Sequence, residues 1–222
     1  MLHILMNQTK INLVSPYRNI TQSTIIKILP HHMNSDIRNN MKLNLKKKVE
    51  KRCNKNGFID EVHEITEYNN GIIPSENLSG AAFYNVSYNC RICIPIENSI
   101  IIAETKIINS ELVMAKNGPI YIFIPKENIS SNIWNIGQNF MNKNSKKKLK
   151  ENNLVKIKIL NKRINKNDFQ IKCIGKLLDF ASDEEINKYY GLIENVEEKN
   201  ILEEKNDSDI DDLSDKMNNF II

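Results

Sequence analysis

The stretch Gly80–Pro125, GAAFYNVSYNCRICIPIENSIIIAETKIINSELVMAKNGPIYIFIP, decides the fold class. Apolar and polar residues alternate along almost all of it, which is the pattern of half-buried β-strands. Turn-forming residues interrupt the alternation at Pro95–Asn98, Asn109–Ser110 and Asn117–Gly118. The stretch contains no nucleophile elbow, phosphate-binding loop or acid pair. It therefore predicts a sheet that binds partners or nucleic acid, not one that catalyses a reaction.

The residues before this stretch predict a small α+β unit. Residues 9–14 and 20–29 have strand-like patterns, and residues 58–68 alternate as a strand does. Between them, Ile37, Met41, Leu45 and Val49 recur every four residues and form one apolar helical stripe. The order strand, helix, strand, strand indicates one helix lying on an antiparallel sheet. We assign residues 1–96 to this N-terminal domain.

The residues after Pro95 predict a second, all-β domain. Five short strands are expected at residues 99–108, 111–115, 119–124, 154–160 and 169–175. Short strands separated by turns favour a five-stranded Greek-key barrel of the OB type. We place this barrel at residues 97–180, with residues 126–153 as an insertion that holds a helix or a functional loop. The fold class is therefore α+β.

Charge is distributed unevenly along the chain, whose net charge is +4. Residues 193–222 hold ten acidic residues and three lysines, a net charge of −7, so residues 1–192 carry +11. A basic body with an acidic tail is typical of proteins that handle polyanions. The alternative is a solvated tail without a role. We expect residues 181–222 to form a short helix followed by this acidic, flexible tail.

Hydrophobicity, the N-terminal residues and the cysteines indicate whether the chain is a membrane, secreted or zinc-binding protein. The chain has no apolar window of about 18 residues and no basic, small-residue signal at its start, so we expect neither a membrane span nor secretion. The four cysteines are then expected to be reduced thiols. Cys90 and Cys93 form a CxxC, but residues three apart on a strand point to opposite faces, which argues against zinc.

Four stretches together resemble one protein family. In this order and spacing, over about residues 8–180, they are similar to the stalk subunit of multisubunit RNA polymerases, which is the seventh-largest subunit of RNA polymerase II and has a counterpart in archaea. The turn after Pro95 and the missing glycine near Asn109–Ser110 depart from the family pattern, and the acidic tail is extra. The four stretches are Asn56–Ile65, Gly80–Pro95, Gly118–Ile124, and Val155–Ile159 with Ile171–Gly175.

The resemblance implies both a fold and a function. The family has an N-terminal tip domain, a truncated RNP-like fold, that docks on the polymerase core, and a C-terminal OB barrel. It implies contact with the largest polymerase subunits, with a partner like the fourth-largest subunit, and with nascent single-stranded RNA near the exit path. It implies no catalytic residue, cofactor or metal. The chain is rich in Asn, Lys and Ile and departs from the family pattern, which is expected of a polymerase subunit encoded by a large DNA virus. The alternatives are an AT-rich protist and a different class of cellular polymerase. The expected location is the virion and host cytoplasm, or the nucleus if the chain is cellular.

Basic and aromatic residues of the barrel are the candidate RNA-binding site. Tyr121 and Phe123 share one face of their strand, opposite three isoleucines, so they are expected to point outward or to pack on the insertion, for example on Trp134. Phosphates favour rows of cations because binding releases counterions. The candidate cations are Lys146, Lys147, Lys148, Lys156, Lys158, Lys162 and Arg163.

Two loops of the N-terminal domain are the candidate docking site on the polymerase core. They hold Pro16 and Tyr17, and the apolar group Ile72, Ile73 and Pro74. Two other functions stay open. A free OB-fold RNA-binding protein acting in translation or RNA decay would bind single strands tightly without a partner. An enzyme would need a pocket with paired titratable groups, which the sequence does not offer.

Overall fold

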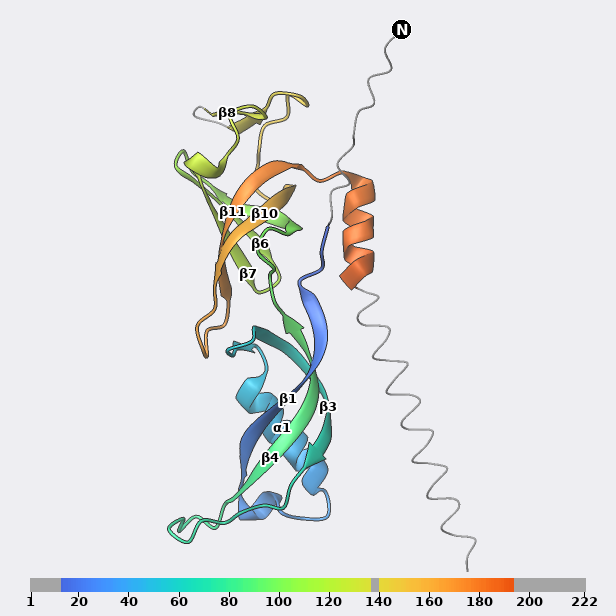
Figure 1. Ribbon diagram of the computed structural model, residues 1–222, viewed down its shortest axis with the longest axis vertical. Helices are drawn as coiled ribbons and strands as arrows, with labels where there is room; N and C mark the ends of the chain where they lie inside the picture. Colours follow the sequence, from blue (N-terminus) through green and yellow to red (C-terminus); the bar gives the residue numbers. More distant parts are fainter. Residues whose placement is uncertain (1–12, 137–139, 194–222) are drawn as a thin grey trace, which may run out of the picture. The chain divides into compact units, whose positions relative to one another are not determined.

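The computed structural model describes residues 13–136 and 140–193, and these residues divide into two compact units. The predicted acidic tail and most of the strand predicted at residues 9–14 lie outside the described residues. Residues 17–94, with 164–170 and 190–193, form the sheet unit. Residues 13–16, 95–163 and 171–189 form the barrel unit. Figure 1 shows the elements of both units.

The sheet unit is an antiparallel sheet with one helix on it, as the sequence predicts. Its strand order is β1-β4-β3-β2. The helix α1 packs on β1 and β3 and covers one face of the sheet (Figure 1). The elements are β1 (Tyr17–Ile28), η1 (Pro30–His32), α1 (Ile37–Val49), β2 (Arg52–Cys53), β3 (Phe58–Tyr68) and β4 (Ala82–Cys93).

The core of the sheet unit lies between α1 and the sheet. Met41 and Leu45 are fully buried, and Ile37 and Val49 pack at the edge of the same cluster, so the predicted helical stripe is confirmed. Across from them, β4 contributes alternate residues such as Tyr88. The helix ends because Glu50 is extended and the next residue adopts a left-handed φ.

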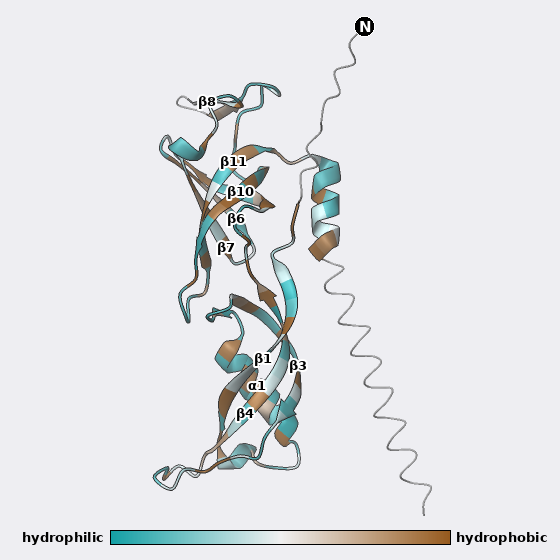
Figure 2. Cartoon of the chain, in the orientation of Figure 1, coloured by the Kyte–Doolittle hydropathy of each residue, from teal (hydrophilic) through white to brown (hydrophobic). Residues whose placement is uncertain are grey.

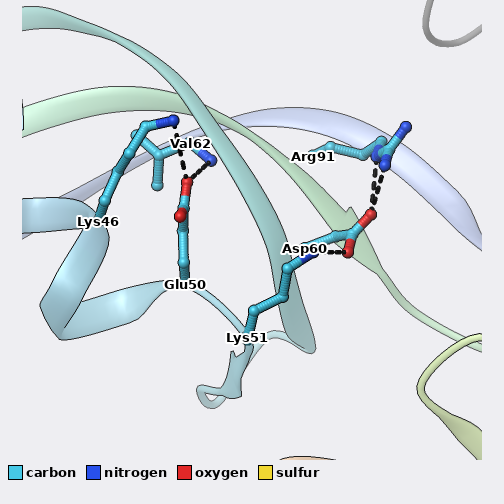
Figure 3. Close-up of polar contacts among 6 residues, drawn as sticks. All are labelled: Lys46, Glu50, Lys51, Asp60, Val62 and Arg91. Atoms are coloured by element: carbon cyan, nitrogen blue, oxygen red, sulfur yellow. Dashed lines mark hydrogen bonds and ion pairs between the residues drawn. The ribbon is translucent and has the colours of Figure 1, made fainter.

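A polar network joins the end of α1 to the sheet (Figure 3). The carboxylate of Glu50 accepts a hydrogen bond from the backbone N–H of Val62 at 2.8 Å. Asp60 accepts from Arg91 Nε at 2.9 Å and from Lys51 Nζ at 2.7 Å. Burial alone would raise the pKa of the Asp60 carboxyl, but these two cations outweigh it and hold the pKa below its ordinary value.

The barrel unit is a closed five-stranded barrel with the strand order β10-β11-β7-β6-β5. The pairing of β11 with β7 is parallel, and the other pairings are antiparallel. This arrangement is compatible with the predicted OB fold. Buried and more exposed residues alternate along β7 and through the first seven residues of β11, whereas β5 and β10 each have three consecutive buried residues; Figure 2 shows the hydropathy of these strands. The strands are β5 (Ile100–Ile108), β6 (Leu112–Asn117), β7 (Ile120–Pro125), β10 (Leu154–Arg163) and β11 (Ile171–Phe180).

The insertion between β7 and β10 holds η2 (Lys126–Asn128) and a hairpin of β8 (Trp134–Ile136) and β9 (Phe140–Asn142). It is anchored on β11. The buried indole of Trp134 donates a hydrogen bond from Nε1 to the carbonyl oxygen of Leu178 at 3.0 Å, and its ring lies 5.2 Å from the ring of Phe180. Trp134 therefore packs on the end of β11.

A helix at residues 183–193 follows the barrel, as predicted. Ser182 and Glu185 form a reciprocal capping box: Ser182 N–H donates to Glu185 Oε2 at 2.9 Å, and Glu185 N–H donates to Ser182 Oγ at 3.3 Å. Two contacts hold the helix on the barrel. Lys156 forms an ion pair with Glu185 at 3.0 Å, and Asn117 Nδ2 donates to the hydroxyl of the buried Tyr189 at 2.8 Å.

Candidate nucleic-acid interface

The outward face of β7 is where the predicted aromatic residues lie. Ile120, Ile122 and Ile124 are fully buried in the barrel, while Tyr121 and Phe123 alternate with them and are half-buried. Both rings therefore lie on the face of β7 that is opposite the barrel core.

Strand register places cations beside these rings, because directly paired residues of neighbouring strands point to the same face. Tyr121 pairs with Lys116 on β6 and with Lys172 on β11, and Lys172 in turn pairs with Arg163 on β10. The ammonium of Lys116 lies 5.2 Å from the centroid of the Tyr121 ring, a distance typical of a cation–π contact. One row across four strands thus holds three cations and an aromatic ring.

The neighbouring rows extend this surface. Phe123 pairs with Ile174, which is 45% exposed, and Lys176 pairs with Lys158. One acid approaches the surface: Glu104 pairs with Lys116 across β5 and β6, and Lys106 holds its carboxylate at 2.7 Å. We call the whole surface the outer barrel face. It consists of Lys116, Tyr121, Phe123, Lys158, Arg163, Lys172 and Lys176.

Three members of the outer barrel face were missed by the sequence analysis, namely Lys116, Lys172 and Lys176. The sequence does contain a pattern that indicates two of them. Lys172 and Lys176 alternate with the buried Ile171, Cys173 and Leu177, which places both lysines on the outward face of β11. Their placement beside Tyr121 depends on the parallel pairing of β11 with β7. Long-range pairing of this kind cannot be derived from alternation along one strand.

The structure places the other predicted cations elsewhere. Lys156 is only 9% exposed and is bound to Glu185, so the helix at 183–193 covers it. Lys162 is half-buried and donates to the carbonyl oxygen of Pro95 at 3.0 Å. Neither side chain is part of the outer barrel face.

The lysine run of the insertion forms a separate basic site. Lys146, Lys147 and Lys148 are all exposed. Lys147 and Lys148 line a groove of about 510 Å³ that also includes Phe180 and Ile186. Of the candidate RNA-binding residues, two thus line this groove, namely Lys147 and Lys148, and four belong to the outer barrel face, namely Tyr121, Phe123, Lys158 and Arg163.

The candidate docking residues differ in exposure. Ile72 and Ile73 are 64% and 57% exposed, and Pro74 is exposed beside them. Ile72 is held in place by two backbone hydrogen bonds with Phe83, at 2.9 and 3.0 Å.

At the other candidate loop, Pro16 is buried and Tyr17 is half-buried, with the guanidinium of Arg91 5.5 Å from its ring centroid. The 72–74 loop is therefore the more accessible of the two.

All four thiols are buried. Burial raises the pKa of Cys53 and Cys90 to about 11 and that of Cys173 to about 12. Cys90 lies in the core under α1, and its Sγ contacts the carbonyl oxygen of Ile20 at 3.6 Å. Within the described residues, no group of three His, Cys, Asp or Glu side chains could hold a metal ion.

Comparison with known proteins gives a consistent set of relatives, although no protein-family model matches the chain. A protein of Acanthamoeba polyphaga mimivirus, assigned by name to DNA-directed RNA polymerase as subunit L376, is 36% identical over 165 residues, 74% of this chain and 83% of the relative. The RNA polymerase II subunit RPB7 of Glycine max is 25% identical over 158 residues, and subunit 7 of Arabidopsis thaliana is 24% identical over 158 residues. Each plant match covers 69% of this chain and 88% of the relative.

Proposed function

The chain belongs to the family of DNA-directed RNA polymerase subunits that includes subunit 7 of plant RNA polymerase II, and we propose that it acts in transcription as the non-catalytic stalk subunit of a viral enzyme of this kind. The length of the alignment with the mimivirus protein is the main support for this proposal. The 165 residues aligned with the mimivirus protein are more than either unit contains, so the relationship includes residues of both. The sheet unit would be the RNP-like tip domain, and the barrel unit would be the distal OB domain.

We propose that the sheet unit docks on the largest polymerase subunits through its 72–74 loop. Ile72, Ile73 and the fully exposed Leu78 offer apolar side chains on one connection between β3 and β4. Exposed apolar groups of this kind are typical of protein–protein interfaces. Changing Ile72 and Ile73 to Ser should abolish co-purification with the polymerase. Changing Ile25 to Ser is the matched control, since Ile25 is 55% exposed on β1 of the same unit.

The barrel unit is proposed to contact nascent single-stranded RNA through the outer barrel face. Stacking of a base on an aromatic side chain such as Tyr121 contributes about 1–3 kcal/mol in single-strand-binding proteins. The surrounding lysines would bind phosphates without sequence preference. The exposed lysine run Lys146–Lys148, part of which lines the groove of about 510 Å³, is a second surface for the same RNA strand. Changing these three lysines to Ala should therefore weaken RNA crosslinking and leave assembly intact.

An experiment distinguishes this function from that of a free RNA-binding protein. Gel filtration is performed on the chain alone and after co-expression with a small polymerase subunit like the fourth-largest one. A stalk subunit should elute as a stable heterodimer and bind RNA weakly when alone. If the chain stays monomeric, does not bind this subunit and binds single-stranded RNA tightly, a role in translation or RNA decay would be favoured.

We propose that the protein is found in the virion and host cytoplasm, where a viral polymerase would work, or in the nucleus if its gene is cellular. No helix among the described residues is long and apolar enough to cross a membrane. Fractionation of purified virions, followed by detection of the chain together with the largest polymerase subunits, would test the viral location.

A further inference from the structure

A groove of about 600 Å³ lies in the sheet unit, whereas both proposed RNA surfaces belong to the barrel unit. It opens beside the end of α1 and the β2–β3 turn, and its floor includes Val49, Ile59 and Tyr88. No Asp or Glu is among its lining residues. Four cations line it, namely Lys48, Arg52, Lys55 and Lys166, and we call it the basic groove.

None of the four cations of the basic groove forms an ion pair with a described residue. Arg52 has the ring of Phe169 5.2 Å from its guanidinium carbon, and Lys48 donates to a backbone carbonyl, that of Ile25. Lys55 forms no ion pair with any described residue. The acid nearest in sequence to Lys166 is Asp168, whose carboxylate accepts a hydrogen bond from Asn165 at 2.9 Å. An anionic segment that binds in the groove could therefore form ion pairs with these four side chains.

A buried polar group in the groove also lacks a partner. Gln22 Nε2 is buried and makes no hydrogen bond with the described residues. The other amide atom, Oε1, accepts from Asn54 Nδ2 at 2.6 Å, which orients the amide. A buried donor without an acceptor is costly, and an occupant with carboxylate or carbonyl oxygens would satisfy it.

We infer that the basic groove binds the acidic tail of this same chain, residues 194–215. The tail holds ten acids, and Ile201, Leu202, Ile210 and Leu213 between them could contact the apolar floor. The 22 residues from Glu194 to Asp215 can extend about 75 Å, which lets the later acids of the tail reach the groove. Because the tail is attached to the same chain, its effective concentration at the groove is on the order of millimolar. An acidic segment of another protein would need a higher concentration to compete with it at equal affinity.

Zero-length carbodiimide crosslinking of the purified full-length chain tests this inference, because it joins carboxylates directly to lysines in contact. Mass spectrometry should find the tail acids joined mainly to Lys48, Lys55 and Lys166, and these links should disappear in about 1 M salt, where charges are screened. Tail acids joined evenly to lysines of both units would overturn the inference. Links between labelled and unlabelled copies in a mixed sample would also overturn it, since they would show binding to a second copy.

Charge variants of the full-length chain make the test specific to the groove. In the K55Q/K166Q variant, the yield of tail links to Lys48 should fall roughly two- to tenfold, as expected for loss of two exposed ion pairs. The R18Q/K27Q variant removes the same charge from exposed positions of β1 outside the groove and should leave the yield unchanged. An equal yield in all three proteins would contradict the inference. The experiment uses the chain alone, so its result does not depend on the polymerase assignment.

Discussion

Neutralising the outer barrel face should change the salt dependence of RNA binding by a predictable amount. The perturbation is the K172Q/K176Q variant, because both lysines are exposed on β11 and neither forms an ion pair with a described residue. Glutamine keeps the length and polarity of the side chains, so the barrel should fold as before. Only the phosphate contacts of this face should be lost.

The magnitude follows from the number of cations on this face. Five of its members are Lys or Arg, and each phosphate contact to a single strand contributes about −0.7 to the slope of log K against log salt, giving roughly −3.5. Between about 50 and 200 mM salt the native chain should lose about 130-fold in affinity. With two cations removed, the slope should be about −2.1 and the loss about 18-fold.

Fluorescence anisotropy with a labelled single-stranded RNA of about 12 nucleotides, titrated at several salt concentrations, measures this slope. The matched control is the K126Q/K188Q variant, which removes the same charge from exposed positions of the barrel unit outside the outer barrel face. The reasoning is refuted if the control lowers the slope as much as K172Q/K176Q does. It is also refuted if K172Q/K176Q leaves the slope at its native value.

Three further predictions concern single residues. Changing Tyr121 to Ala should weaken RNA binding by about 1–3 kcal/mol in the same anisotropy assay, whereas Tyr121→Phe should retain it because the stacking surface remains. Gly175→Ala should reduce the free energy of unfolding by about 1–3 kcal/mol in urea titrations, because the new Cβ would lie 2.5 Å from Ile157 Cγ2 and 2.7 Å from Ile122 Cγ2; an unchanged midpoint would show that the barrel core can relax. Asp60→Asn should destabilise the chain at pH 7 by about 1–3 kcal/mol. The native carboxyl has a lowered pKa, so its contribution is present above the unfolded value of about 3.9 and is lost as the pH falls further, and the two proteins should converge in acid.

Local patterns were sufficient to predict most elements of the fold. Alternation located all five barrel strands, and the four-residue stripe located α1. The end of β11 was predicted at Gly175, but the strand continues to Phe180. Glycine is often a strand breaker, but here it allows the side chains of Ile122 and Ile157 to approach the backbone closely.

The candidate site could be predicted only in part, because its assembly depends on contacts between distant residues. The spacing of Lys156 and Lys158 correctly placed both on one face of β10, but Glu185, 29 positions after Lys156, covers the first of them. Lys116 and Lys172 lie on either side of Tyr121 through pairing of three strands. Local sequence patterns do not predict which strands pair with each other. The position of these cations beside Tyr121 can therefore be identified only from the folded barrel.

The most direct test of the central claim, that this chain is a subunit of an RNA polymerase, is affinity purification from infected or native cells followed by mass spectrometry. With the tagged full-length chain as bait, the account predicts recovery of the largest polymerase subunits in near-stoichiometric amounts. Recovery of ribosomal proteins or RNA-decay factors without any polymerase subunit would contradict it.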